Sequence, residues 1–251
     1  MNYKHFIYAI AILIFYGCRK DYQLTKIEGK RLEIDENIVA NAEIEAFIKP
    51  YRMHVNKNLD RVLSYAVDTY SKKDGEFNTA IGNMMADAVM RQSNPIFKKR
   101  TGNDLDIVLL NYGGIRSILS QGNVSIRTAY QIMPFENSVV VATLKGTDIK
   151  AIVSYLQNAK EAHPIAGMQL QLDKNFNVIS ATIKGQPIED HKTYYVATND
   201  YLYHGGDHMT FFKNSSNVEL LDYKIRNVLI DYFTQMDTLK PTIDKRFTKH
   251  N

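Results

Sequence analysis

The most informative stretch of the chain is the hexapeptide Asn111-Tyr112-Gly113-Gly114-Ile115-Arg116, which directly follows the mostly apolar run 106–110. A short apolar run of this kind predicts a buried strand. Two glycines after a strand let backbone N–H groups approach a ligand closely, and an arginine offers a planar fork of donors suited to phosphate, carboxylate or ribose hydroxyls. A tight turn whose end Arg116 merely solvates would give the same pattern, so the six residues alone leave both interpretations open.

The size and charge of the chain limit what it can be. Its 251 residues, 45% of them hydrophobic, are enough for one domain of ordinary size with or without a small extension. The formal net charge is +4, which is too small and too dispersed for a nucleic-acid groove, so we expect no nucleic-acid partner. Tryptophan is absent and tyrosine occurs 16 times, so any stacking on a planar ligand falls to Tyr or Phe.

The N-terminus combines a short apolar run with the only cysteine of the chain. Residues 6–16 are apolar but too few to span a bilayer comfortably, and Gly17-Cys18 follows them before the chain turns polar. This pattern resembles a bacterial lipoprotein signal in which Cys18 becomes the lipidated first residue. A plain N-terminal anchor helix, or a cleaved signal with an incidental cysteine, is the alternative.

We therefore predict three segments: a lipoprotein signal peptide over residues 1–17, a tether over 18–38 and a folded domain over 39–251. The protein would be lipid-anchored to a bacterial membrane, in the periplasm or at the cell surface.

Hydrophobic periodicity predicts an alternation of helices and strands. Upstream of the hexapeptide we expect a helix over about 40–55 that Pro50 kinks or breaks, a strand over 62–67 and a helix over 79–91. Asn83 and Asp87 lie one turn apart on the last of these helices, and a solvated polar face accounts for both. Downstream we expect a strand over 138–144, a helix capped by Thr147, a hairpin over 168–185, a strand over 194–198, a helix over 223–236 and a polar tail. The fold class is α+β, with mixed sheets covered by helices.

Three loops next to strong strands carry the side chains with chemistry: residues 111–116, 133–137 and 199–208. Strands of one domain often deliver their ends to a common edge, where ligands collect. Phe135 and Tyr201 could clamp the faces of a planar base, although Phe135 taken singly reads as a core residue. The same loops supply amides, an arginine and a carboxylate that suits ribose hydroxyls: Asn111, Asn137, Arg116 and Asp207.

Four motifs in this order resemble the 5′-nucleotidase C-terminal domain family over roughly residues 40–247. They are Gly82-Asn83 with Ala86-Asp87-Ala88, the hexapeptide 111–116, Met133-Pro134-Phe135-Glu136-Asn137, and Asn199-Asp200-Tyr201 with Gly205-Gly206-Asp207. The resemblance implies a domain that holds a nucleotide or nucleoside. It implies that Phe135 and Tyr201 sandwich the base, that Asn111 and Asn137 contact base or ribose, that Asp207 takes the ribose hydroxyls, and that Arg116 faces the phosphate or ribose.

The chain departs from this family pattern at two positions. Many members carry an arginine a few residues before the Gly-Asn helix start, where residues 74–79 contain none, and members usually have glycine where this chain has His208. In the family a separate N-terminal metallophosphoesterase domain holds two metal ions and performs the hydrolysis. Here the only close metal-like trio is His204, Asp207 and His208, where a metal would compete with the ribose contact.

Two hypotheses follow for the function. The chain is either the substrate-binding half of a split 5′-nucleotidase or a non-catalytic surface lipoprotein that binds nucleosides or nucleotides. In both cases we expect no catalytic residue and no cofactor in this chain. In the first case the divalent metal ions belong to a separately encoded metallophosphoesterase partner.

Overall fold

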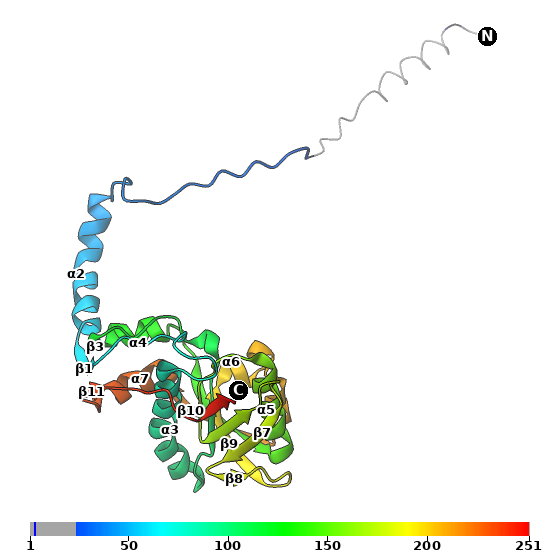
Figure 1. Cartoon of the computed structure of the whole chain (residues 1–251). Coiled ribbons are helices and arrows are strands. Elements are labelled where there is room, and N and C mark those ends of the chain that lie inside the picture. Colours follow the sequence, from blue (N-terminus) through cyan, green and yellow to red (C-terminus); the bar gives the residue numbers. More distant parts are fainter. Residues whose placement is uncertain (1–2, 4–23, 251) are drawn as a thin grey trace. The chain divides into compact units, whose positions relative to one another are not determined.

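The computed structural model describes residue 3 and residues 24–250 (Figure 1), so Cys18 and nearly all of the predicted signal lie outside the described residues. The chain divides into two compact units, residues 1–48 and 49–251, each of which is described by itself. Among the described residues, no helix is long and apolar enough to cross a bilayer. The boundaries expected at residues 17 and 38 stay predictions.

The first described helix is α2 (Ala42–Leu59), which begins where the amide oxygen of Asn41 accepts from the backbone N–H groups of Glu43 and Ile44 at 3.0 and 3.1 Å. Of the kink or break predicted at Pro50, the break is wrong, because α2 continues past Pro50 as one element. Proline removes only one N–H donor from an 18-residue helix, and the turns on both sides keep their own hydrogen bonds. None of the residues of α2 is buried.

A five-stranded sheet positions the loops of interest. Its strand order is β10 (Asn217–Lys224), β4 (Ser138–Lys145), β9 (Thr193–Asn199), β2 (Ile107–Leu109) and β5 (Ile165–Ala166). Strand β2 runs parallel to β9, and β4 runs antiparallel to β9 with Val139 opposite Asn199. The carboxyl ends of β2 and β9 and the start of β4 therefore reach the same edge of the sheet.

This sheet separates two hydrophobic cores. Because successive side chains of a strand point to opposite faces, Val108 and Val141 enter one core while Ile107 and Ala142 enter the other. The first core is covered by α3 (Ala80–Thr101) and α7 (Ile225–Thr234), which lie side by side in Figure 1. The second core is covered by α5 (Gly146–Ala159). Burial on both faces explains why these strands read as continuous apolar runs.

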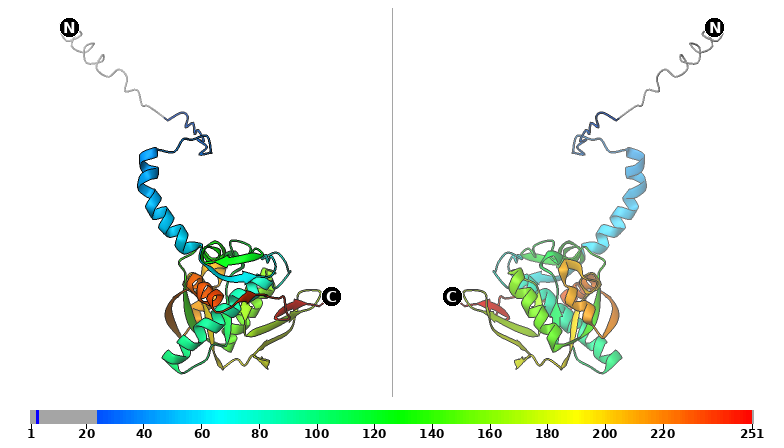
Figure 2. Two further views of the ribbon diagram at one scale, coloured as in Figure 1. Left: turned by 90° about the vertical axis from the view of Figure 1, so that its left-hand side faces the viewer. Right: turned by 90° about the vertical axis from the view of Figure 1, so that its right-hand side faces the viewer.

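Two smaller sheets complete the α+β fold, as predicted. One has the order β11 (Thr238–Leu239), β1 (Val62–Ala66) and β3 (Gly122–Ser125). The other has the order β12 (Phe247–Lys249), β6 (Met168–Leu172), β7 (Val178–Ile183) and β8 (Gln186–Pro187), and β6 with β7 confirms the predicted hairpin. Figure 2 shows the red strand β12 at the edge of this sheet. Short helices α4 (Ile126–Ile132) and α6 (Asp200–Tyr203) follow β3 and β9.

The helix predicted over 79–91 is α3, which is longer and ends only at Thr101 before Gly102 in a left-handed conformation (φ 77°). Thr79 caps it, because its hydroxyl oxygen accepts from the Gly82 N–H at 3.2 Å. A Cβ at Gly82 would lie 2.9 Å from that oxygen and 3.6 Å from a ring carbon of Pro164. Gly82 therefore makes room for the cap, while a Cβ there would make only ordinary contact with Pro164. Helix α5 begins with Lys145 in the cap position, not with Thr147 as predicted.

The segment predicted as a polar tail is part of the folded unit. The amide nitrogen of Asn83, which is only 3% exposed, donates to Asn78 Oδ1 at 2.9 Å and to the Thr242 carbonyl at 3.0 Å. Arg246 donates to both carboxylate oxygens of Asp87 at 2.8 and 3.0 Å. The interpretation of Asn83 and Asp87 as a solvated helix face is therefore wrong, since both side chains hold the C-terminal segment.

Candidate functional site

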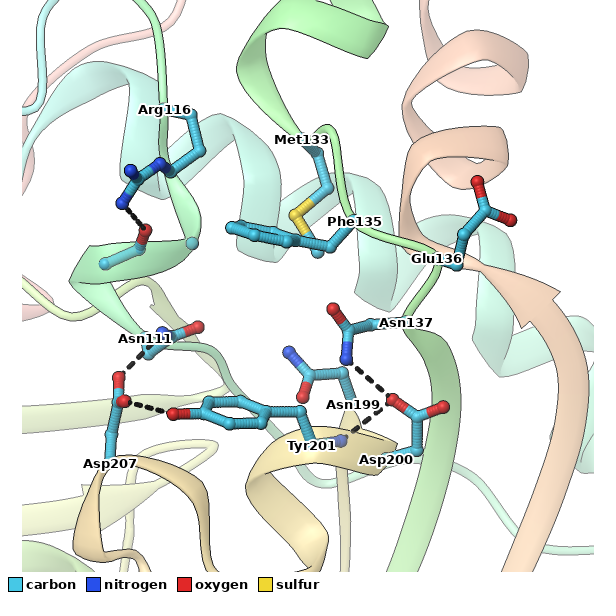
Figure 3. Close-up of a pocket in the computed structure, with 12 residues that line it drawn as sticks. Asn111, Arg116, Met133, Phe135, Glu136, Asn137, Asn199, Asp200, Tyr201 and Asp207 are labelled. Carbon is cyan, nitrogen blue, oxygen red and sulfur yellow. Dashed lines mark hydrogen bonds between the residues drawn. The ribbon is translucent and has the colours of Figure 1, made fainter. Parts of the chain in front are cut away.

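The three loops meet at a cavity of about 700 Å³ (Figure 3). Its position follows from the sheet, because loops 111–116 and 199–208 leave the parallel strands β2 and β9 and loop 133–137 enters β4 at the same edge. All six predicted ligand-binding residues line it: Asn111, Arg116, Phe135, Asn137, Tyr201 and Asp207. The remaining lining residues are Gly113, Gly114, Met133, Glu136, Asn199 and Asp200.

Two aromatic rings lie on opposite sides of the cavity. Figure 3 shows the ring of Phe135 above the open space and the ring of Tyr201 below it. Phe135 is 40% exposed and Tyr201 48% exposed, so the interpretation of Phe135 as a core residue is wrong. A slot between two ring faces accepts a planar, aromatic ligand.

Asp207 connects two of the loops through its side chain. Its Oδ2 accepts from the amide nitrogen of Asn111 at 2.7 Å, and its Oδ1 accepts from the hydroxyl of Tyr201 at 2.8 Å. The hydrogen bond to this carboxylate raises the pKa of Tyr201, which therefore stays a protonated donor at neutral pH. A carboxylate has about four lone-pair sites, so two remain to accept from the hydroxyls of a ligand.

Gly206 is required for the position of Tyr201. A Cβ at residue 206 would lie 2.5 Å from two ring carbons of Tyr201, closer than any real contact. The next two residues, Asp207 and His208, have left-handed backbones with φ of 49° and 62°. Such conformations are strained for residues other than glycine, and aspartate tolerates them better than most. The loop therefore holds strain at the point where the carboxylate is presented.

The Gly113-Gly114 pair also makes room for a side chain of its own loop, while its role in the close approach of a ligand stays a prediction. The Gly114 N–H donates to the Asn111 carbonyl at 3.0 Å within the short 3₁₀ turn η1 (Tyr112–Gly114). A Cβ at Gly114 would lie 2.8 Å from Asn111 Oδ1, and one at Gly113 would lie 3.3 Å from its Nδ2. The glycines therefore leave space for the Asn111 amide, which in turn binds Asp207.

Loop 133–137 is held at its C-terminal end by charged groups. Asp200 accepts from the amide nitrogen of Asn137 at 2.9 Å and from the Ser138 N–H at 3.2 Å, which leaves the Asn137 carbonyl oxygen directed away from Asp200 (Figure 3). Glu136 forms ion pairs with Lys224 and with the buried Arg226. Hydrogen bonds from Lys224 and then Arg226 lower the pKa of Glu136 to about 2. Phe135 thus lies in a loop whose following residues are anchored.

Two cations lie on the side of loop 111–116. The guanidinium of Arg116 lies 5.9 Å from the centroid of the Phe135 ring and donates to the Gly113 carbonyl at 3.4 Å. The ammonium of Lys72 lies 4.3 Å from the centroid of the Tyr112 ring and 3.4 Å from the Tyr112 carbonyl oxygen. Burial, and then the nearby Arg116, lower the pKa of Lys72. Both side chains donate to carbonyl oxygens, and Lys72 also interacts with the carboxylate of Glu161.

The alternative metal site at His204, Asp207 and His208 finds no support in the geometry. Within the part of the chain that the structure describes, no group of three or more His, Cys, Asp or Glu side chains is placed to hold a metal ion. Asp207 instead uses its oxygens to accept from Asn111 and Tyr201.

The family model of the 5′-nucleotidase C-terminal domain matches residues 57–214. The chain belongs to the 5′-nucleotidase C-terminal domain family. Among its relatives, the cell wall protein Lmo0130 of Listeria monocytogenes is 28% identical over 209 residues, which are 74% of this chain and 26% of that protein. The 5′-nucleotidase of Diplobatis ommata is 23% identical in an alignment of 253 positions, gaps included, that covers 89% of this chain and 43% of the relative.

The fold agrees with this family. The crystal structure of a 5′-nucleotidase precursor from Thermus thermophilus superposes with a TM-score of 0.70 at 20% identity, and the match covers 82% of this chain and 43% of that one. The chain therefore spans less than half the length of each of these proteins.

The two departures from the 5′-nucleotidase C-terminal domain pattern have structural counterparts. His208 has the left-handed backbone that the usual glycine would adopt without strain. The segment 74–79, which lacks the usual arginine, instead anchors the C-terminal segment: Asn78 donates to the Phe247 carbonyl at 2.8 Å, and the rings of Phe77 and Phe247 lie 4.9 Å apart.

Sequence reasoning missed several residues that organise this nucleotidase-like site. Asp200 stands beside Tyr201 in a motif that was already recognised, so its polar side chain was a usable signal. Lys72, Tyr155 and His163 gave no such signal, because they lie in other elements and reach the site loops only through packing.

Proposed function

We propose that this chain is the nucleotide-binding half of a split 5′-nucleotidase. Together with a separately encoded metallophosphoesterase it would hydrolyse nucleotide phosphate esters. The observation that carries this proposal is the pair of facing rings, Phe135 and Tyr201, with the hydrogen-bonded carboxylate of Asp207 at the side of the same cavity. A base stacked between the rings places its ribose next to a hydrogen-bond acceptor.

Each part of a nucleotide has a chemically matched group in the cavity. The amides of Asn111 and Asn137 suit the edge of a base or a ribose hydroxyl, and both are oriented by carboxylates. Arg116, with Lys72 behind the same loop, supplies positive charge for a phosphate. The volume of about 700 Å³ is large enough for a nucleotide.

Hydrolysis is assigned to the partner. In this proposal two divalent metal ions bound by the metallophosphoesterase activate water and neutralise the phosphate. This chain contributes binding and orientation and no catalytic residue. The 5′-nucleotidase relative and the solved 5′-nucleotidase precursor support the assignment of the reaction class, and both are more than twice as long as the matched region.

The second candidate function is a non-catalytic surface lipoprotein that binds nucleosides or nucleotides. It is supported by the fact that every proposed ligand contact comes from this chain. Both candidates place the protein outside the cytoplasm, anchored through Cys18, and similarity to a protein named as a cell wall protein agrees with that location. A gene for a metallophosphoesterase next to the gene for this chain would favour the split enzyme.

Calorimetric titration tests the binding function. We expect the purified chain to bind adenosine and to bind AMP more tightly, because only AMP carries charge toward Arg116 and Lys72. Lys72→Met should weaken AMP binding and leave adenosine binding unchanged, since it removes one cation and keeps the aliphatic stem. Equal affinities for AMP and adenosine in the wild-type chain would contradict the phosphate assignment, and no binding of either would contradict the function.

A phosphate-release assay tests the split reaction. Supplied with divalent metal, the chain alone should not release phosphate from AMP. Turnover that survives repurification and scales with the amount of this chain would contradict the split-enzyme proposal.

A further inference from the structure

Two side chains behind the cavity connect the loops that carry its polar groups. The Nδ1 atom of His163 accepts from the backbone N–H of Tyr112 at 3.2 Å. The hydroxyl of Tyr155 donates to the backbone carbonyl of Asp207 at 2.9 Å. The two rings pack against each other with centroids 5.4 Å apart. Neither residue lines the cavity, yet together they link the loop of Asn111 to the loop of Asp207.

The fold fixes this pair firmly. His163 lies between α5 and β5, and the carbonyl of the next residue, Pro164, accepts from the Leu110 N–H at 2.9 Å. His163 itself is only 3% exposed. Tyr155 projects from α5 and packs edge-on against Phe211 at 5.6 Å. The pair is therefore attached to the protein core and holds the two loops from behind.

We infer that His163 is a positioning residue for ligand binding: its neutral imidazole holds the backbone of loop 111–116, and Tyr155 ties it to the loop that presents Asp207. The inference rests on the proposed function of the cavity. Only an unprotonated Nδ1 can accept from the Tyr112 N–H, so the neutral ring carries its proton on Nε2. Protonation of Nδ1 would leave the Tyr112 N–H facing a second donor and would release the loop.

The groups around the ring set the pH at which this happens. Burial lowers the pKa of His163. Three groups act in the opposite direction and offset the effect of burial only in part: Glu161, whose Oε2 lies 3.7 Å from Nε2, the Leu110 carbonyl and Asp207. Tyr155 faces the ring from α5, and Lys72, which interacts with Glu161, is the cation on the Tyr112 side. Nε2 is buried and has no hydrogen-bond partner. Loop 111–116 is therefore fully held at pH values above the ordinary histidine pKa. It is released as the pH falls through the lowered pKa of His163.

Adenosine is the appropriate probe, because its own charge does not change over this pH range, whereas the phosphate of AMP titrates. For the full chain we expect adenosine affinity to be constant above the ordinary histidine pKa and to fall at lower pH, as His163 becomes protonated. His163→Asn keeps an acceptor near the Nδ1 position that cannot be protonated, so it should bind nearly as wild type at pH 7.5 and lose the acid dependence. His163→Leu should bind roughly 3- to 10-fold more weakly at every pH, as should Tyr155→Phe. His191→Asn, at an exposed histidine between β8 and β9, should change neither affinity nor its pH dependence.

A ligand-free measurement separates this inference from the proposed function and does not need the leucine variant to fold. In nuclear magnetic resonance spectra of the wild-type chain, the backbone amide of Tyr112 should shift with the titration of the His163 ring, and in His163→Asn it should not. Absence of adenosine binding at any pH would overturn the proposed function and this role in it. Normal wild-type binding with a flat pH profile, or a Tyr112 amide that does not follow His163, would overturn the inference alone.

Discussion

At the scale of single residues, the position of the Tyr201 ring depends on residues only a few positions away in the chain. Tyr201 donates to Asp207 across one turn of the chain, and Gly206 between them leaves the space in which the tyrosine ring lies. Phe135 has no such local partner in its own loop and is placed by its anchored neighbours, Glu136 and Asn137. Both rings are therefore partly exposed to solvent and are still held in position by neighbouring residues.

The first prediction concerns the two rings. Stacking one base on one aromatic ring contributes about 1–3 kcal/mol, so Phe135→Ala and Tyr201→Ala should each weaken adenosine binding by roughly 5- to 150-fold. The double variant should lose less than the sum, because both rings grip the same base. Calorimetry gives the affinities and a melting curve gives the stability.

The same variants test whether either ring is structural. Since both are about half exposed, melting temperatures should stay close to wild type, whereas Phe233→Ala at a fully buried site should lose about 3–5 kcal/mol of stability. A large loss of stability in Phe135→Ala with adenosine affinity preserved would exclude the clamp.

The second prediction concerns Gly206. An added methyl group would overlap the Tyr201 ring, so Gly206→Ala should displace the ring and reduce adenosine affinity about as much as Tyr201→Ala does. When Tyr201→Ala is already present, the clash no longer exists and Gly206→Ala should have little further effect. A double-mutant cycle by calorimetry measures this coupling. Additive losses would show that Gly206 acts through some other contact.

At the scale of elements, loop 133–137 is held in position by strand β10 and helix α7. Lys224 at the end of β10 and Arg226 in the first turn of α7 both pair with Glu136. Arg226 is buried, with its guanidinium 4.0 Å above the ring of Tyr130 in α4. The loop that carries Phe135 therefore takes its position from elements that lie far along the chain, at residues 217–234.

The third prediction concerns the pH dependence of this clamp. The pKa of Glu136 is lowered from 4.5 to about 2 in the folded protein, so its contribution is fully present above pH 4.5 and is lost as the pH falls toward 2. The melting temperature of Glu136→Gln should lie below that of wild type near neutral pH, and the difference should shrink through this range. Glu189→Gln, at an exposed glutamate whose lysine partner is 3.7 Å away, is the matched control. A difference that is independent of pH would rule out the ion pairs as its cause.

At the scale of the whole molecule, we expect the folded unit and the N-terminal region to have separate roles. The compact unit of residues 49–251 contains the complete cavity, while Cys18 lies far upstream of it in the sequence. A lipid at Cys18 would attach this unit to a membrane through the intervening chain. Binding and anchoring should therefore be separable by mutation.

The fourth prediction tests that separation. Cys18→Ser should release the protein from the membrane fraction, because a thioether-linked lipid would be its only strong attachment. Adenosine affinity should be unchanged, since the cavity belongs to another unit of the chain. Membrane fractionation followed by immunoblotting, with calorimetry on the released protein, checks both expectations. Unchanged fractionation of the variant would contradict the lipid anchor.

The sequence by itself determined the features that depend on neighbouring residues. Continuous apolar runs indicated β2 and β4, because a strand buried on both faces has no polar side to show. The start of α3 near Thr79 was visible from helical periodicity, and the six predicted residues that line the cavity were marked by polar and aromatic types placed next to strand ends. Each of these signals depends on only a few neighbouring residues, so any sequence with the same local pattern would show it.

Only the tertiary structure decided which distant groups meet. Asn83 and Asp87 bind the segment around Arg246, about 160 positions further along the chain. His163 and Tyr155 support loops 111–116 and 199–208 but belong to neither loop. Periodicity in the sequence indicates that one face of a helix or strand is polar or buried, but it does not indicate which segment packs against that face. The partner follows from how β2, β4 and β9 order themselves in the sheet and which segment then packs behind their ends. For that reason the six residues that line the cavity and were predicted to bind a ligand were visible in the sequence, and those that hold them in place were not.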